Sequence, residues 1–216
     1  MKRFLNIALS LLLTMAAYGI EYADTAIYQG MNLKFDLGTP VFEMARSSAN
    51  IQSYELALNV DLKHRYFPTI EMGYAHALNR TVASGATFNG MGGYARLGLD
   101  ITPLKKGNAD NMLLVGLRVG TALQDYSMLN VPVADPYWQT VGLQDYMHRF
   151  RCDVWGEIVA GVQVQVYKSF HMGWFVRMKI LMTRGKQGEP VAYYIPGYGY
   201  TEDINFGFNY YIGWKF

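Results

Sequence analysis

The sequence is poor in cysteine and histidine and, beyond its N-terminus, in long apolar runs. Cys152 is the only cysteine among 216 residues, which excludes an internal disulfide, and the 4 histidines lack the spacing of a metal site. No later apolar run reaches about 18 residues, which excludes transmembrane helices but not strands, because a strand crosses a membrane in about 9–11 alternating residues. A hydrophobic fraction of 51% with 15% aromatic residues excludes a disordered chain.

The N-terminus has the pattern of a secretory signal peptide. A short apolar run follows Lys2 and Arg3 and ends in the small-x-small sequence Ala17-Tyr18-Gly19. We predict a signal peptide over residues 1–19 and one domain over residues 20–216, with a retained anchor helix as the alternative. Without Lys2 and Arg3 the chain has 17 Lys and Arg against 17 Asp and Glu, so no basic excess indicates a nucleic-acid partner.

The rest of the chain alternates between large apolar residues and small or polar ones, which is the period-two pattern of β-strands. The last segment, INFGFNYYIGWKF, has a large apolar residue at every second position. The same test predicts eight strands, at residues 31–37, 54–63, 68–77, 91–101, 111–123, 153–166, 171–182 and 204–216. The predicted fold class is therefore all-β.

Two regularities indicate where these strands lie. Every charged residue within them falls on the less apolar, glycine-rich face, whereas a water-soluble sandwich or lipocalin carries its charges outside. The connections also alternate, with long ones at 38–53, 78–90, 124–152 and 183–203 and short ones at 64–67, 102–110 and 167–170. Both features predict a transmembrane up-and-down antiparallel β-barrel of eight strands, with long outer loops and short periplasmic turns. An extra hairpin within 124–152 would give ten strands.

Four segments carry a resemblance to a known family: HRYFPTIEMGYAHA, ADPYW, GVQVQVYKSFHMGW and YYIPGYGY. In this order they resemble an uncharacterised family of small outer-membrane β-barrels from Bacteroidota-type envelopes, with Ile195 to Gly199 as the most specific element. The resemblance implies a bacterial outer-membrane location and, as partners, outer-membrane lipids and the barrel-assembly machinery. The terminal Phe216 resembles the C-terminal signal that this machinery reads. The family has no assigned activity, so the resemblance implies no functional residues.

The charges of the inward face are the first candidate site. A narrow lumen would bring together both signs, which either fill the barrel as a salt-bridge plug or form a path for protons or ions. Equal numbers of both signs favour the plug, because buried charges have to be paired. The predicted network consists of Glu55, Glu71, Arg96, Arg118, Glu157, Arg177 and Lys179.

The aromatic outer loops are the second candidate site. Tyrosine and tryptophan are common at recognition surfaces, because one ring offers apolar area and a polar tip. These side chains either bind a glycan or a protein or pack over the barrel mouth as a cap. They are Tyr137, Trp138, Tyr193, Tyr194, Tyr198 and Tyr200.

Signals for catalysis are weak. His76, His148, Ser84 and Ser127 fall on or near the outer loops, but no spacing links them as nucleophile and base. We therefore assign no catalytic residue, metal or cofactor and predict a non-enzymatic, porin-like outer-membrane barrel that serves envelope integrity or surface recognition. The alternatives are a lipid-modifying enzyme of the outer membrane, either an acyltransferase or a deacylase, and a narrow pore.

Overall fold

The computed structural model describes residues 27–38, 50–80, 85–103, 111–134, 137, 140–183 and 191–216. The predicted signal peptide lies outside these residues. Eight long strands follow one another: β1 (Tyr28–Asp36), β2 (Asn50–Leu62), β3 (Tyr66–Arg80), β4 (Thr87–Ile101), β5 (Asn111–Ala134), β6 (Val141–Tyr167), β7 (Phe170–Leu181) and β10 (Ile204–Lys215). A two-residue pair, β8 (Tyr194–Ile195) and β9 (Gly199–Tyr200), precedes β10.

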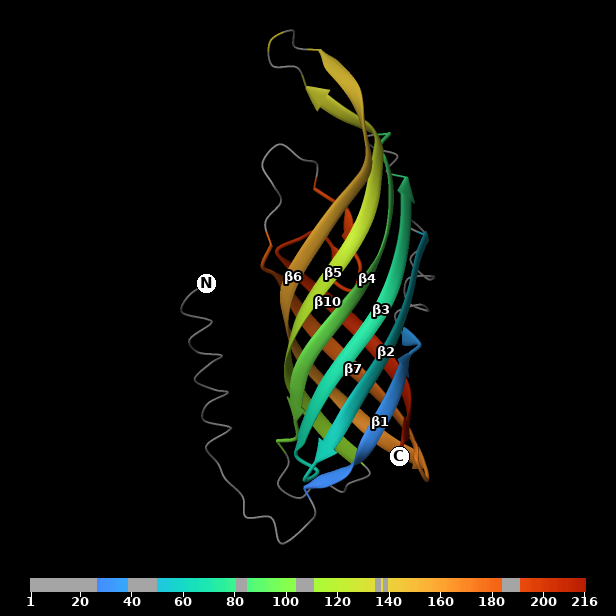
Figure 1. Ribbon diagram of the computed structural model, residues 1–216, viewed down its shortest axis with the longest axis vertical. Coiled ribbons are helices and arrows are strands. Elements are labelled where there is room, and N and C mark those ends of the chain that lie inside the picture. Colours follow the sequence, from blue (N-terminus) through green and yellow to red (C-terminus); the bar gives the residue numbers. More distant parts are fainter. Residues whose placement is uncertain are drawn as a thin grey trace.

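The long strands form one antiparallel sheet that closes into a barrel, because β1 pairs with β10 (Figure 1). At the closure Phe35 is opposite Ile212, and Met31 and Phe216 exchange backbone hydrogen bonds of 3.1 and 2.8 Å. Closure removes the free edges that an open sheet exposes. The prediction of an all-β chain with eight antiparallel strands is confirmed.

No helix among the described residues is long and apolar enough to cross a membrane.

The two faces of the sheet differ in polarity as the alternation predicts. Inside the barrel, Glu71 and Arg177 are 1% and 0% exposed. Outside it, Met72, Leu97 and Phe206 are 57%, 62% and 71% exposed. The barrel therefore has a polar, charged interior and an apolar outer surface.

Strands β5 and β6 are much longer than the alternation predicts. Residues 124–152 were expected to be a loop, but β5 continues to Ala134 and β6 begins at Val141, with Val133 opposite Gly142 near the tip. The two strands rise beyond the rest of the barrel as a hairpin, at the end opposite the C-terminus (Figure 1). We call residues 127–146 the distal hairpin. It extends two existing strands, so the barrel has eight strands and not ten.

The predicted alternation of loop lengths holds only in part. The connection expected at 78–90 shrinks to 81–86, because β3 ends at Arg80 and β4 begins at Thr87. At the end of the barrel near the C-terminus, which we call the turn end, β2 and β3 are joined by residues 63–65 and β6 and β7 by 168–169. The lengths of the predicted loops were therefore a poor guide, because large parts of 78–90 and 124–152 belong to strands.

The segment that contains β8 and β9 folds into the mouth of the barrel at the hairpin end. Ala192, Ile195 and Tyr198 are buried, and Ile195 and Tyr198 pack in one apolar cluster with Trp155 of β6. Gly197 has a φ of 74°, and a Cβ there would lie 2.5 Å from the ring of Tyr94. Only glycine allows both this backbone conformation and the close approach to the barrel wall.

The interior is stacked in layers along the barrel axis. On the inner face of β3, Ala75 is followed by Glu71 and then by Phe67, and on β6 Trp155 is followed by Glu157 and then by Val159. Apolar clusters thus lie on both sides of a charged layer. The cluster toward the turn end consists of Ala57, Phe67, Met112, Leu114, Val159, Phe175 and Tyr211.

Candidate functional site

Glu71 of β3 is the centre of the charged layer. Its carboxylate accepts hydrogen bonds from Arg96 (2.8 Å), Arg118 and Arg177 (2.8 and 3.0 Å), which reach it from three different strands. Arg118 also donates to Asp100 at 2.8 Å. One buried carboxylate thus binds three buried guanidinium groups.

Glu55 and Glu157 complete the neutralisation of these arginines. Glu55 accepts a hydrogen bond of 2.8 Å from Arg96 and lies 3.4 Å from Arg177. Glu157 accepts one of 2.9 Å from Arg177 and lies 3.0 Å from Nε of Arg96 as an ion pair. The structure therefore brings six of the seven predicted lumen residues into one connected ion-pair network.

The seventh residue, Lys179 of β7, has a different partner. Its ammonium donates to the backbone carbonyls of Gly197 and Tyr198, at 2.7 and 3.1 Å, and Arg96 donates to the Gly197 carbonyl as well, at 2.7 Å. Two lumen cations thus fasten the β8–β9 segment to the charged layer. The contact joins the predicted charge network to the predicted outer-loop residues, which the sequence alone did not connect.

The β8–β9 segment is also held by its own tyrosine. The Tyr198 hydroxyl donates a hydrogen bond of 2.5 Å to the carbonyl of Glu202, and its ring meets Trp155 edge-on with centroids 5.8 Å apart. Burial raises the pKa of Tyr198 to about 12, so the hydroxyl stays protonated at physiological pH. A cavity of about 70 Å³ remains between this segment and the charged layer, next to Glu55, Lys179 and Asn205.

Sequence reasoning missed several members of the network. Tyr94 and Tyr211 both donate hydrogen bonds to Glu55, at 2.7 and 2.5 Å, and Trp155 donates one of 2.6 Å to Glu157. The alternation of the sequence already placed these three side chains on the inward face. Their partners were not visible, because the sequence does not show that Gly73 makes room for the ring of Tyr94 and Gly120 for that of Trp155 on neighbouring strands.

Tyr194 and Tyr198, expected at an outer recognition surface, lie inside the barrel mouth. They are 5% and 1% exposed and belong to the apolar clusters that close the mouth. Tyr193 is 40% exposed, and its ring meets that of Tyr200 edge-on at 5.3 Å. The expected cap thus describes these tyrosines better than an exposed binding surface does.

Tyr137 is separate from those tyrosines. It is 81% exposed at the tip of the distal hairpin, and its predicted neighbour Trp138 lies outside the described residues. The six predicted loop aromatics therefore do not form one surface. The distal hairpin instead exposes apolar side chains on its own strands, with Val141 at 69% and Leu143 at 68%.

Three of the polar residues weighed for catalysis lie on described segments. His148 and Ser127 come together on β5 and β6, where the imidazole bonds Asp125 at 3.2 Å and the backbone N–H of His148 donates to the Ser127 hydroxyl at 3.2 Å. His76 lies elsewhere, 3.0 Å from Asn89, and Ser84 is outside the described residues. The serine contact uses the backbone and not the ring, so it is not a nucleophile–base pair.

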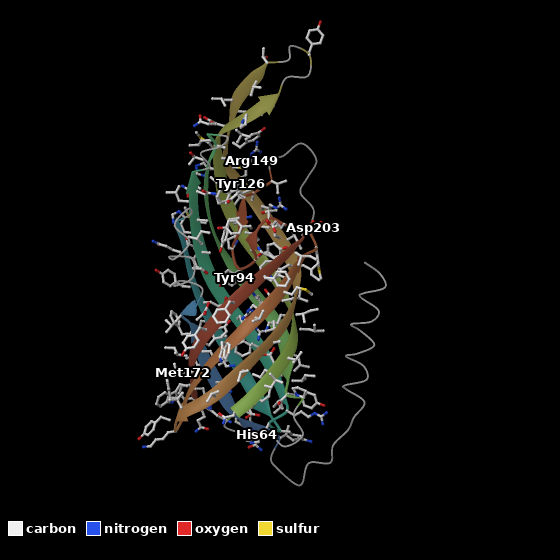
Figure 2. The ribbon with its side chains drawn as sticks, turned by 180° about the vertical axis from the view of Figure 1, so that it is seen from behind. His64, Tyr94, Tyr126, Arg149, Met172 and Asp203 are labelled. Atoms are coloured by element: carbon white, nitrogen blue, oxygen red, sulfur yellow. The ribbon has the colours of Figure 1, made fainter. Side chains whose placement is uncertain are left out.

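Other candidate chemistry is sparse in the described part of the chain. No group of three or more His, Cys, Asp or Glu side chains there is arranged to hold a metal ion. Cys152 is an exposed free thiol on β6, 3.7 Å from the hydroxyl of Thr121. Figure 2 shows Tyr94 at mid-height of the barrel, Arg149 toward the distal hairpin, and His64 and Met172 near the turn end.

Phe216 follows the last residue of β10. Its backbone completes the pairing with β1, and its side chain is 70% exposed. The structure thus presents the ring outward, on the same face as Trp214. Its suggested role as an assembly signal stays a prediction.

The fold and the site define the chain as a closed eight-stranded antiparallel barrel with a charge-filled interior. A family model described as a domain of unknown function (DUF6048) matches residues 2–215, and the chain belongs to this family. No curated protein and no solved structure matches the chain.

Proposed function

We propose that this chain is an integral β-barrel of a Gram-negative outer membrane, with a sealed lumen, that presents the distal hairpin for recognition at the cell surface. It is non-enzymatic in this proposal. The observation that carries the proposal is the inverted polarity of the barrel. Its ionised groups are buried at the centre, while its large apolar side chains are exposed around the perimeter.

The apolar perimeter supports the membrane location. Water-soluble monomers rarely expose contiguous apolar patches larger than a few hundred Å². In hydrocarbon a closed sheet satisfies every backbone N–H and C=O within the barrel, and its outer face is an apolar band flanked by aromatic residues. The outward residues include Leu56, Met72, Leu97, Leu117, Val119, Trp174, Val176, Phe206, Phe208 and Trp214.

The layered interior supports a sealed lumen. The charged layer is neutralised by its own ion pairs, and apolar clusters lie on both sides of it. An ion would have to leave water and pass both apolar layers, which costs several kcal/mol for each charge. We expect no steady conductance in planar lipid bilayers, and a stable open state in single-channel recordings would contradict the sealed lumen.

The distal hairpin is the best-placed recognition element. It rises past the barrel mouth and exposes Tyr137, Val141 and Leu143 at its tip, where apolar side chains have no lipid to cover them if the barrel spans the membrane. Clusters of exposed apolar and aromatic residues mark contact sites. We expect envelope glycans or proteins to protect the tip from protease, and the double variant Val141→Ser/Leu143→Ser to lose that protection.

Location and orientation are tested together with single cysteines. In a Cys152→Ser background, Tyr137→Cys places a thiol at the hairpin tip and Lys168→Cys places one at the opposite, turn end. A membrane-impermeant maleimide should label the first in intact cells and the second only after the outer membrane is opened. Labelling of both in intact cells, or recovery of the protein in the soluble fraction, would refute the proposal.

One observation favours lipid modification as a second candidate. Asp125 bonds the imidazole of His148 at 3.2 Å, so this pair could act as a base, although Ser127 contacts only the backbone of His148. If they are catalytic, the acyl pattern of envelope lipids should change on deletion of the gene and be restored by the wild type but not by His148→Ala. His76→Ala is the matched control, and an unchanged lipid profile would exclude this candidate.

A further inference from the structure

The lumen contains a second cavity, toward the turn end, that meets the charge network only at Tyr211. It has a volume of about 10 Å³, and its lining includes Asn32, Lys34, Gln163 and Phe175. Such a volume accommodates one water-sized species. The space exists because Lys34 pairs in register with Gly213, and Gln163 with Gly173, so that each long polar side chain faces a residue with no side chain.

Lys34 differs from the other cations buried in the lumen. Arg96, Arg118 and Arg177 bind carboxylates, and Lys179 binds two carbonyls. Lys34 is 6% exposed and has no hydrogen bond or ion pair with the described residues; its Nζ lies 5.3 Å from the centroid of the Phe175 ring. An ammonium has three N–H donors and no acceptor, and an unpaired buried charge costs several kcal/mol.

The amides beside Lys34 also lack partners. Asn32 and Gln163 are each 2% exposed, and neither the nitrogen nor the oxygen of either amide makes a hydrogen bond with the described residues. Asn59, directly opposite Asn32 on β2, has an unpartnered amide as well. Buried polar groups are normally hydrogen-bonded, so a cluster of orphaned amides indicates a bound species that contacts them.

We propose that this cavity binds one small monovalent anion of chloride size, held by the Lys34 ammonium and by the amide N–H groups of Gln163 and Asn32. No carboxylate lines the cavity, and the nearby carboxylates of Asp100 and Glu71 form their ion pairs with arginines and none with Lys34 in the described part of the chain. The positive charge of Lys34 disfavours a cation in the cavity. Each amide can turn its NH₂ group toward an anion. Water would satisfy the hydrogen bonds but would leave the charge of Lys34 unpaired.

Bromide is the probe for the site. The full-length mature protein is purified in detergent and crystallised in bromide, and the anomalous scattering of bromine locates bound ions. We expect a single internal peak between Lys34 and Gln163 that is lost in Lys34→Met and retained in Lys63→Met, which removes an equal charge at an exposed turn position. An internal cavity without a peak, or a peak that persists in Lys34→Met, overturns the proposal.

Thermal unfolding tests the same site in solution. Because an anion that binds only the folded state stabilises it by mass action, the Tm of the wild type should rise with chloride relative to gluconate at equal ionic strength. The Tm of Lys34→Met should not respond, while Lys63→Met should behave as the wild type does. Gln163→Leu removes one hydrogen-bond donor and keeps the charge of Lys34, so it should shift the response to higher chloride concentration. This variant also tests the site if Lys34→Met does not fold. Equal responses in the wild type and both site variants, or no response in the wild type, would refute the anion site.

Discussion

Strands β5 and β6 each run through two regions, the barrel and the distal hairpin, and these regions are built differently. Within the barrel, every second residue of β5 from Met112 to Tyr126 is buried. In the distal hairpin the same strand has no buried position among its described side chains, and β6 is mostly exposed from Val141 to Phe150. Hydrogen bonding between the strands continues through both regions. The difference indicates that strand pairing is the main support of the hairpin, whereas the barrel also depends on the side chains that fill it.

Removing the central carboxylate should have the largest effect. Glu71→Gln leaves three buried guanidinium groups without their shared anion, and breaking a buried pair typically costs about 3–5 kcal/mol. We expect the free energy of unfolding to fall by this amount. It is measured by urea titration of the refolded protein, in which the compact and unfolded forms give separate bands on gels. Glu202→Gln, exposed in the β9–β10 connection, should leave the midpoint unchanged.

A double variant distinguishes loss of the ion pair from a general packing defect. Arg118→Gln removes one of the three cations that Glu71 binds. If the network is coupled, Glu71→Gln/Arg118→Gln should be destabilised by clearly less than the sum of its single variants. Simple additivity would show that the charged layer is not held together by ion pairing.

Matched glycine substitutions compare the two regions directly. A Cβ at Gly120 would meet the indole of Trp155, 2.7 Å from Nε1, whereas a Cβ at Gly142 in the hairpin has its nearest neighbour at 4.0 Å. Gly120→Ala should therefore cost about 1–3 kcal/mol by overpacking, and Gly142→Ala should stay within about 0.5 kcal/mol of the wild type. Equal effects in the same unfolding assay would mean that the lumen is not close-packed.

Tyr198→Phe should have a smaller, pH-dependent effect. It removes the hydrogen bond to the Glu202 carbonyl, which contributes about 1 kcal/mol. Because the pKa of Tyr198 is raised from 10.0 to about 12, its hydroxyl contributes fully below pH 10, and that stability is lost as the pH rises through 12. The stability of the wild type relative to Tyr198→Phe should thus decline over this range. A constant difference would place Tyr198 in water.

Replacing residues 129–146 by Asn-Gly should have the smallest effect on stability. The hairpin buries little, so the free energy of unfolding should change by no more than about 0.5 kcal/mol. Its protection by envelope components should disappear with it. Loss of barrel assembly in this variant would show that the hairpin is part of the folding unit.

Sequence alternation located the barrel strands well and the distal hairpin badly, for one physical reason. Alternation reflects two different environments on the two faces of a strand. Glu157 and Ile158 show it because one faces the lumen and the other the outside, at 3% and 36% exposed. Residues 127–133 and 141–146 of the distal hairpin do not show it, because none of these side chains is buried. Their strand structure was therefore hidden in what looked like a loop.

The amino-acid sequence by itself determined which face of each strand is charged, since side-chain direction along a strand depends only on parity. Tertiary structure decided which charges meet. Glu71 binds Arg177, 106 residues away, only because the sheet closes and places β3 across the lumen from β7. Tertiary structure also decided that Tyr198 faces inward, because Lys179 and Arg96 bind backbone carbonyls of its segment. Every residue has a backbone carbonyl, so the sequence does not show which of them a side chain will bind.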